Sequence, residues 1–273
     1  MDKITIKKLE IFANHGVFAE EKALGQKYLI SVEMYADLKN AAKTDNLEYS
    51  IDYGKICHNI KDFAEKNTFN LIESVAEGIA TRLLRDNIML KKVVVEVEKP
   101  NAPIPLPFES VSVKIIRQRH VVYIALGSNI GDRDSHLQFG VSGLNKAGDC
   151  SVTRVSEFIN TAPYGNVNQT DFLNGCLELE TLLSPHELLT LTKEIEQKSG
   201  RVRSEHWGPR TLDLDIIFFD DMIISDDKLR IPHIDAHRRD FVLKPMAEIA
   251  PNFFHPIYMK TVRELLEELE VEQ

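Results

Sequence analysis

The sequence has no long apolar stretch. Of its 273 residues, 43% are hydrophobic and 27% are charged, which is the balance of a globular protein. No run approaches the roughly 20 apolar residues that crossing a bilayer requires. The N-terminal segment MDKITIKKLEIF also lacks the apolar core of a secretory signal peptide. We therefore expect a cytoplasmic protein that does not enter a membrane.

Cysteine is scarce, and its spacing excludes two kinds of site. The three cysteines, Cys57, Cys150 and Cys176, are far apart and include no CxxC pair. A disulfide framework or a structural zinc site would require closer and paired cysteines. We interpret all three as reduced thiols that pack as small hydrophobic side chains.

The chain lacks the positive charge of a nucleic-acid-binding protein. Its net charge is -9, which disfavours non-specific binding to nucleic acid or to an anionic membrane. The first 119 residues hold 18 of the 33 basic and 17 of the 42 acidic residues, so the second half is strongly acidic. Two arginine clusters interrupt that acidic half, at Arg201, Arg203 and Arg210 and at Arg238 and Arg239. Arginine clusters in an acidic domain indicate one specific anionic ligand.

The sequence contains no GxxxxGK[ST] motif, no internal repeat and no low-complexity segment. The stretch GSNIGD (127–132) resembles a glycine-rich phosphate loop but lacks its lysine. We interpret it as a turn between a strand and a helix, with little functional weight. A P-loop enzyme is therefore excluded.

The first half predicts an α+β domain. Strand-like runs occupy 4–13, 27–38, 91–99 and 109–118, and helical spacing of apolar residues covers 53–66 and 70–86. A proline-rich loop, PNAPIPLP, occupies 100–107. The order ββααββ places the helices on one face of an antiparallel sheet.

The second half predicts a ferredoxin-like α/β sandwich. Strands are expected at 120–129, 152–161, 172–180 and 212–220, with helices at 132–147 and 184–200. Ser184 is suited to cap the second helix, Pro185 to its first position and Gly200 to its end. This βαββαβ order is that of a ferredoxin-like fold, and two further helices follow near 240–250 and 261–270. The boundary falls near residue 119, without a flexible linker, so the domains are 1–118 and 119–273.

One predicted strand carries two acids on one face. In GPRTLDLDIIF (208–218), Asp213 and Asp215 are two residues apart, and side chains at i and i+2 project to the same side of a strand. Two carboxylates on a packed face repel each other, and Mg²⁺ relieves that repulsion while also binding substrate phosphates. Taken alone, the pattern also fits a strand with one solvated face. Arg201, Arg210 and Arg239 nearby favour phosphoryl transfer, because guanidinium groups bind phosphate oxygens.

Four stretches of the second half carry a resemblance to a known family. They are GRVRSEHWGPRTLDLDIIFF (200–219), LGSNIGD (126–132), TAPYGNVNQTDFLN (161–174) and IPHIDAHRRDFVLKPMAEIAP (231–251). Across essentially all of 120–273 they closely resemble 6-hydroxymethyl-7,8-dihydropterin pyrophosphokinase. That family transfers a pyrophosphoryl group from ATP to the hydroxymethyl group of a reduced pterin, using two Mg²⁺ and no organic cofactor.

The resemblance implies roles for individual residues. It assigns the metals to Asp213 and Asp215, phosphate transfer to Arg201 and Arg210, the ATP site to Glu196, Arg203, Trp207, His233 and Arg239, and the pterin site to Thr161, Pro163, Tyr164, Phe172, Asn174 and Phe241. Phe172 and Phe241 would enclose the pterin ring between two aromatic faces. Without the resemblance, a core position is the favoured interpretation of either phenylalanine alone.

The first half resembles dihydroneopterin aldolase. The stretches that carry this resemblance over 1–118 are FANHGVFAEEKALGQKY (12–28), SIDYGKI (50–56), NLIESVAEGIA (70–80) and VEKPNAPIP (97–105). The resemblance implies the tunnelling fold and a ring of subunits with sites between them. That family cleaves 7,8-dihydroneopterin to glycolaldehyde and 6-hydroxymethyl-7,8-dihydropterin, without a metal or a Schiff base.

By this resemblance, Glu73 anchors the amino-pyrimidine edge of the pterin, and Lys99 acts through water as the acid–base group. Tyr53, from a neighbouring subunit, relays the proton, and Glu21 orders the site. Spacing alone leaves other interpretations open. Lys99 could lie at the solvated end of a strand, and Glu73 could simply be an acid favoured near the start of a helix. Tyr53 could be a core residue.

The product of the first reaction is the substrate of the second. We therefore interpret the chain as one bifunctional enzyme of folate biosynthesis. Its partners are 7,8-dihydroneopterin, 6-hydroxymethyl-7,8-dihydropterin and ATP, and it assembles as a homo-oligomer through the aldolase domain. Two alternatives stay open at this point: only one half is catalytically active, or the second half is a non-catalytic ferredoxin-like binding module.

Overall fold

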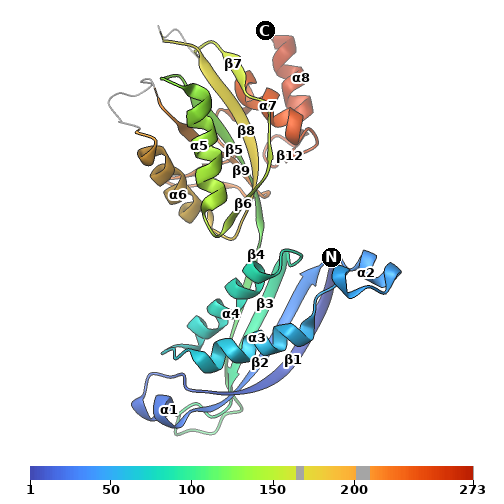
Figure 1. Ribbon diagram of the computed structural model, residues 1–273, viewed down its shortest axis with the longest axis vertical. Helices are drawn as coiled ribbons and strands as arrows, with labels where there is room; N and C mark the ends of the chain where they lie inside the picture. Colours follow the sequence, from blue (N-terminus) through green and yellow to red (C-terminus); the bar gives the residue numbers. More distant parts are fainter. Residues whose placement is uncertain (164–168, 201–209, 273) are drawn as a thin grey trace. The chain divides into compact units, whose positions relative to one another are not determined.

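The computed structural model describes residues 1–163, 169–200 and 210–272. The chain divides into two compact units, Met1–Arg119 (unit 1) and His120–Gln273 (unit 2). Figure 1 shows each unit as a sheet with packed helices. Within the described ranges, none of the helices combines the length and the apolar character that a membrane span needs.

Unit 1 is built on a four-stranded antiparallel sheet in the order β1-β2-β3-β4. Its strands are β1 (Asp2–Ala13), β2 (Gln26–Ala36), β3 (Lys92–Lys99) and β4 (Val111–Gln118). Its helices are α1 (Ala19–Leu24), α2 (Lys39–Thr44), the short 3-10 helix η1 (Leu47–Tyr49), α3 (Tyr53–Lys66) and α4 (Ile72–Asp86).

Alternation along the strands explains why α3 and α4 cover one face of this sheet. Every second residue of β2 is buried, from Tyr28 to Ala36, and the residues between them are partly exposed. The helices present buried residues at helical spacing, such as Ile56 and Ile60 in α3 and Ile79 and Leu83 in α4. Figure 1 shows both helices on the same side of the sheet. The predicted ββααββ arrangement is confirmed.

Unit 2 is built on a five-stranded antiparallel sheet. Its strands are β5 (His120–Ser128), β6 (Cys150–Val155), β7 (Ile159–Thr161), β8 (Phe172–Thr181) and β9 (Asp213–Phe219). Two small hairpins pair β10 (Ile224–Ser225) with β11 (Arg230–Ile231) and β12 (Phe254–His255) with β13 (Lys260–Thr261). The helices are α5 (Arg133–Lys146), α6 (Pro185–Lys198), the 3-10 helix η2 (Ala236–Arg238), α7 (Asp240–Ile249) and α8 (Val262–Glu272).

The spatial order β6-β8-β5-β9 is that of a ferredoxin-like sandwich. The first and third main strands of this unit, β5 and β8, lie in the centre, and the second and fourth, β6 and β9, lie at the edges. Helices α5 and α6 connect the strands of each half. The predicted fold class is therefore confirmed.

Both faces of this sheet are covered. One core cluster joins the strands to α5 and α6 through residues such as Leu137, Leu144 and Ile195. A second cluster joins the opposite face to α7 and α8 through Met246 and Leu265. Figure 1 shows the two helix pairs on opposite sides of the sheet. The additional layer formed by α7 and α8 becomes one wall of the site described below.

The observed elements differ from the sequence prediction, and two of the differences have a clear physical cause. The strand expected at 152–161 is broken after Val155. At this point the Ser156 hydroxyl, in place of a backbone carbonyl, accepts a hydrogen bond from the Cys176 N–H, 2.9 Å away. The short helices α1 and α2 were not predicted. Each has six residues and buries none of them, so neither produces an apolar periodicity.

The predicted cap of α6 is confirmed and allows a stability test. The Ser184 side chain accepts from the Glu187 N–H, and the Glu187 carboxylate accepts from the Ser184 N–H at 2.8 Å, which completes a capping box. We expect Ser184→Ala to lower the free energy of unfolding by about 1 kcal/mol, measured by scanning calorimetry.

Thr190→Ala, at an exposed position within the same helix, is the matched control. Alanine favours the helix interior, so this substitution should leave stability unchanged or slightly higher. An unchanged transition temperature in Ser184→Ala would show that the capping box contributes nothing.

Candidate active sites

The pocket of unit 2 lies where three strands end side by side. Gly127 of β5 pairs with Asn174 of β8 on one side and with Asp213 of β9 on the other. Two residues further into β5, Ala125 pairs with Cys176 and Asp215. The central strand thus presents only small residues to this face. A side chain on Gly127 would bring its Cβ to 3.0 Å from the Asn174 Oδ1, so glycine keeps the floor open.

The pocket has a volume of about 300 Å³ and collects predicted residues from distant parts of the chain. The predicted site residues that line it are Thr161, Pro163, Phe172, Asn174, Arg210, Asp213, Asp215, His233, Arg239 and Phe241. The first four belong to β7, β8 and the segment between them, and the last three to the segment leading into α7 and to α7 itself. The Asn174 amide donates to the Thr161 hydroxyl at 2.7 Å, which holds β7 against β8 at the rim.

The two acids of β9 lie in an environment that opposes their charge. Burial, and then the nearby carboxylates of Asp213 and Glu196, raise the pKa of Asp215 to about 7. Arg210 and Arg239 act in the opposite direction but do not cancel these effects. Two neighbouring carboxylates that resist ionising together attract a divalent cation strongly, because the cation stabilises both negative charges.

These residues suit Mg²⁺ but do not form a complete metal cage. Within the described residues, no group of three or more His, Cys, Asp or Glu side chains is arranged to hold a metal ion. Mg²⁺ needs no such cage, because it binds through one or two carboxylates and completes its shell with water and substrate phosphates. The open pocket beside Asp213 and Asp215 fits that mode of binding.

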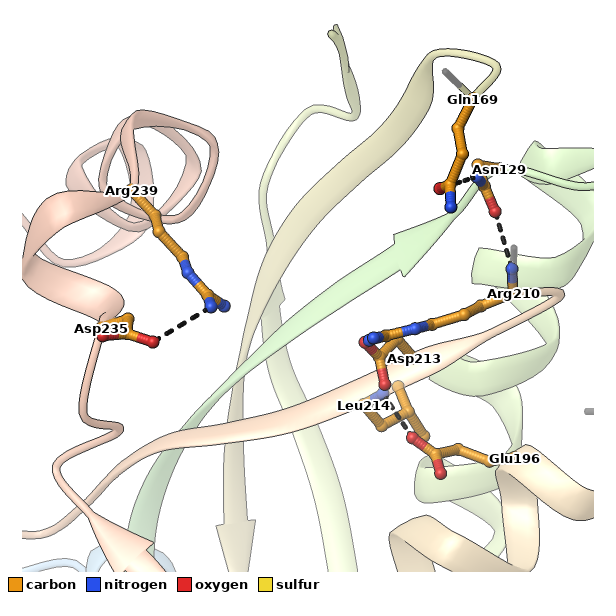
Figure 2. Close-up of polar contacts among 8 residues, drawn as sticks. All are labelled: Asn129, Gln169, Glu196, Arg210, Asp213, Leu214, Asp235 and Arg239. Atoms are coloured by element: carbon orange, nitrogen blue, oxygen red, sulfur yellow. Dashed lines mark hydrogen bonds and ion pairs between the residues drawn. The ribbon is translucent and has the colours of Figure 1, made fainter. Parts of the chain in front are cut away.

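Two arginines reach the pocket from opposite sides. Figure 2 shows Arg210 and Arg239 pointing toward each other across the sheet, with Asp213 next to Arg210. Arg210 forms an ion pair with Asp213, and Arg239 forms one with Asp235 at 3.3 Å. The Arg239 guanidinium also lies 5.8 Å from the centre of the Phe241 ring. The pocket therefore combines cationic groups for an anion with aromatic surface for a flat ring.

Glu196 does not line the pocket. It lies on α6, is buried, and its Oε1 accepts a hydrogen bond from the Leu214 N–H at 2.9 Å (Figure 2). Leu214 separates the two acids on an edge strand, so this bond satisfies a donor that no neighbouring strand can satisfy. Glu196 fixes the strand that presents Asp213 and Asp215, and its contact with ATP stays a prediction.

The predicted residues Tyr164, Arg201, Arg203 and Trp207 lie outside the residues that the structure describes. Their assigned roles remain predictions.

The candidate site of unit 1 centres on a buried ion pair. Lys99, the last residue of β3, forms an ion pair with Glu21 of α1, and their side chains are only 12% and 9% exposed. The Phe18 N–H donates to the same carboxylate at 3.1 Å and the Gln26 amide at 3.0 Å. Burial raises the pKa of Glu21, but the hydrogen bonds from Lys99 and Phe18 outweigh it and lower the pKa overall. Glu21 is thus held as an anion beside Lys99.

The two other predicted residues of unit 1 lie at its surface. Tyr53 is 61% exposed at the start of α3, and Glu73 is exposed in the first turn of α4. Among the described residues, neither forms a hydrogen bond with Glu21 or Lys99. The structure therefore pairs Glu21 with Lys99, whereas the side chains of Tyr53 and Glu73 stay exposed within one chain.

Two family models match this chain. The model described as 7,8-dihydro-6-hydroxymethylpterin-pyrophosphokinase (HPPK) matches residues 123–251, and the dihydroneopterin aldolase model matches residues 4–116. Unit 2 is also similar to the 2-amino-4-hydroxy-6-hydroxymethyldihydropteridine pyrophosphokinase of Bacillus subtilis, at 47% identity over 48% of this chain and 78% of that protein. The chain belongs to the pyrophosphokinase family. Its unit 1 is a dihydroneopterin aldolase domain, so the predicted combination of two folate-biosynthesis domains is confirmed.

Longer relatives match nearly the whole chain. The folic acid synthesis protein FOL1 of Dictyostelium discoideum is 33% identical over 94% of this chain. The chain spans 43% of that protein and 37% of a relative from Schizosaccharomyces pombe, which is less than half the length of each. The Escherichia coli dihydroneopterin aldolase structure in complex with neopterin aligns at 31% identity over 43% of this chain and 99% of that one, with a TM-score of 0.40.

The sequence analysis missed one residue that organises the pyrophosphokinase pocket. Asn129, in the turn after β5, accepts from the Arg210 N–H at 2.7 Å and donates to the Gln169 side chain at 3.2 Å (Figure 2). Its carbonyl accepts from the Thr170 hydroxyl at 2.7 Å. Asn129 thus joins two pocket-lining segments that are about 40 residues apart in sequence. The signal was present in GSNIGD, which was given little weight because it lacks the P-loop lysine.

The raised pKa of Asp215 predicts a pH-dependent stability of the pyrophosphokinase domain. The folded domain keeps a proton that the unfolded chain loses above the ordinary value of 3.8. The stabilisation from this proton is complete below that value and is lost as the pH rises to about 7. With a chelator present at pH 8, we expect Asp215→Asn to be about 2 to 4 kcal/mol more stable than the native protein.

This difference should fall by about half at pH 5, because the native carboxyl is then protonated in the folded domain. Thermal unfolding at both pH values measures it, and Asp221→Asn, in the exposed turn after β9, is the matched control. A stability gain that is the same at pH 5 and pH 8 would contradict the raised pKa.

Proposed function

We propose that this chain is a bifunctional enzyme that carries out two consecutive steps of folate biosynthesis. Residues 1–118 cleave 7,8-dihydroneopterin to glycolaldehyde and 6-hydroxymethyl-7,8-dihydropterin. Residues 119–273 transfer a pyrophosphoryl group from ATP to the new hydroxymethyl group and release AMP. The observation that carries the proposal is that one pocket of unit 2 collects the paired acids, two arginines and two phenylalanines.

The contents of that pocket support the transfer reaction. Asp213 and Asp215 would hold two Mg²⁺ with the ATP phosphates, and the metal would supply charge neutralisation on the phosphate oxygens when bound. Arg210, with Arg201, would bind the phosphates during transfer. Arg239 and His233 would bind ATP, together with Glu196, Arg203 and Trp207. Burial and the charge of Arg239 lower the pKa of His233, which favours a neutral imidazole able to accept a hydrogen bond.

The pterin would occupy the other end of the same pocket. Phe172 and Phe241 would enclose its ring, and Asn174, Thr161 and the segment 162–164 would bind its polar edge. A buried amide can both donate to and accept from a heteroaromatic edge. The hydroxymethyl group would then face the paired acids and Arg210. In this arrangement the two phenylalanines would bind the flat ring, and the charged residues would bind the reactive end of the substrates.

The geometry of unit 1 supports the aldolase reaction. Lys99 and Glu21 form a charged pair withdrawn from solvent, where a water-mediated proton transfer to and from the substrate hydroxyl is possible. Glu73 would bind the amino-pyrimidine edge of the pterin. Tyr53 would come from a neighbouring subunit to relay the proton to the new enol carbon. The exposure of Tyr53 and Glu73 supports a homo-oligomer whose sites are completed between subunits.

The direct test supplies the purified chain with 7,8-dihydroneopterin, ATP and Mg²⁺ and follows the products by mass spectrometry. Glycolaldehyde and 6-hydroxymethyl-7,8-dihydropterin should form first, and the pterin diphosphate and AMP should follow. Omitting ATP should stop the sequence at 6-hydroxymethyl-7,8-dihydropterin. A chain that supports only one of the two steps would reject bifunctionality.

Asp213→Ala should abolish the second step and spare the first. Loss of one of the two acids removes part of the metal site, and we expect AMP formation to fall by about a thousandfold. Glycolaldehyde release should stay at the native rate. Asp221→Ala serves as the control for removing an acid from the same region. Equal loss of both activities in folded protein would count against two independent sites.

Lys99→Ala should have the reverse effect. Removing the acid–base group is expected to slow glycolaldehyde release by about a hundredfold or more, with AMP formation from added 6-hydroxymethyl-7,8-dihydropterin unchanged. Lys114→Ala, an exposed lysine of β4 outside the proposed site, is the matched control. A native aldolase rate in Lys99→Ala would remove Lys99 from the reaction.

A further inference from the structure

The turn Asn14-His15-Gly16 between β1 and α1 has no part in the function proposed so far, yet it borders Glu21 and the helix that carries it. The Asn14 amide donates to the Lys22 carbonyl of α1 at 2.7 Å. Gly16 has a φ of 147° and lies so close to Glu21 that a Cβ would approach the Glu21 Oε2 to 2.3 Å. A side chain at position 16 would therefore displace the carboxylate that pairs with Lys99.

His15 joins this turn to the segment that precedes Glu73. Its Nδ1 accepts a hydrogen bond from the Phe69 N–H at 3.2 Å, and the Gly16 N–H donates to the Phe69 carbonyl at 2.9 Å. Phe69 lies three residues before α4, whose first turn carries Glu73. Two backbone hydrogen bonds thus fix the approach to the pterin-binding residue against the turn that borders Glu21.

The bond from Phe69 also determines the state of the imidazole. Because Nδ1 accepts a hydrogen bond, it carries no proton, and the proton of the neutral ring is on Nε2. Burial, and then the charge of Lys99, lower the pKa of His15, so the ring stays neutral. His15 is 1% exposed, and its Nε2 has no hydrogen-bond partner among the residues that the structure describes.

A buried N–H donor near a charged pair requires an acceptor, since leaving it unsatisfied costs about 1 to 3 kcal/mol. Few groups near the ring can accept this bond. The Tyr28 hydroxyl donates to the His15 carbonyl at 2.6 Å, a charged Lys99 can only donate, and the Glu21 carboxylate already accepts from Phe18, Gln26 and Lys99. The Gln26 Oε1 is a buried acceptor that also has no hydrogen-bond partner among the described residues. A bound water satisfies such a donor and also reaches its neighbours.

We propose that His15 is a positioning residue of the aldolase site: its Nδ1 holds the segment leading to Glu73, and its Nε2–H holds the water through which Lys99 acts. This inference rests on the aldolase function proposed above. It assigns two separable tasks to the two nitrogens of one ring. Loss of the first task weakens pterin binding, and loss of the second slows the chemical step.

Two substitutions separate these tasks. In His15→Asn the amide oxygen can replace Nδ1 as the acceptor for Phe69, but nothing replaces Nε2–H. In His15→Gln the longer amide can replace Nε2–H, but the acceptor for Phe69 is lost. We expect His15→Asn to lower kcat for 7,8-dihydroneopterin by about tenfold to a hundredfold with KM nearly unchanged. We expect His15→Gln to raise KM by about tenfold with a smaller loss in kcat.

AMP formation from 6-hydroxymethyl-7,8-dihydropterin, measured on the same samples, controls for intact protein and should be native in both variants. A native kcat in His15→Asn would overturn the role of Nε2. Equal changes of kcat and KM in both variants would reduce His15 to a packing residue beside Tyr28 and Phe69.

A native chain that releases no glycolaldehyde would contradict the proposed function instead. The proposal for His15 would then be decided by ¹⁵N NMR of the histidine ring and by titration with neopterin. The Nε2–H tautomer, together with neopterin binding weakened in His15→Gln and not in His15→Asn, would support it. The Nδ1–H tautomer, or equal binding by both variants, would overturn it.

Discussion

The burial of Asp215 beside a second acid, Asp213, is the constraint on which unit 2 depends. A strand places both carboxylates on the same face, and the pocket withdraws them from water, so the folded domain bears an unfavourable charge arrangement of its own. Neighbouring elements are arranged around it: Arg210 pairs with Asp213, Glu196 fixes the strand between the acids, and Ala125 and Gly127 leave the space in front of them open. Such an arrangement is relieved by cations and is therefore suited to binding a metal with phosphates.

In unit 1, by contrast, the charged groups of the site, Glu21 and Lys99, neutralise each other in an ion pair. Glu21 accepts hydrogen bonds from the backbone, from an amide and from Lys99, and both charged groups are nearly buried. A buried pair of this kind contributes little net stability, because its desolvation cost offsets the attraction. Its value is positional, since it fixes a lysine in a site with little solvent. The proposed proton transfers need that fixed position, whereas the proposed phosphoryl transfer needs the paired acids of unit 2 as metal ligands.

Much of the fold could be predicted because local rules agreed with the tertiary structure. Helices α3, α4 and α6 have apolar residues at helical spacing, and the predicted Ser184 cap and strand alternation are present. The failures have physical causes: α1 and α2 bury no residue, and the break between β6 and β7 depends on a bond from Ser156 to a distant strand. The i, i+2 spacing in the strand DLDIIFF predicted that two acids share one face, and only the nearby arginines made a cation site the favoured interpretation.

By itself, the sequence determined the elements, the two-domain order and the identities of the charged and aromatic residues that the chemistry requires, because these depend on spacing along the chain. Only the tertiary structure decided which of them meet. Asn129 joins Arg210 to Gln169, Gly127 lies between Asn174 and Asp213, and His15 contacts Phe69 across 54 residues of sequence. Such contacts are set by strand register and by loops that return to the same point in space. Periodicity in a sequence specifies which face a residue occupies but not which distant residue lies opposite it.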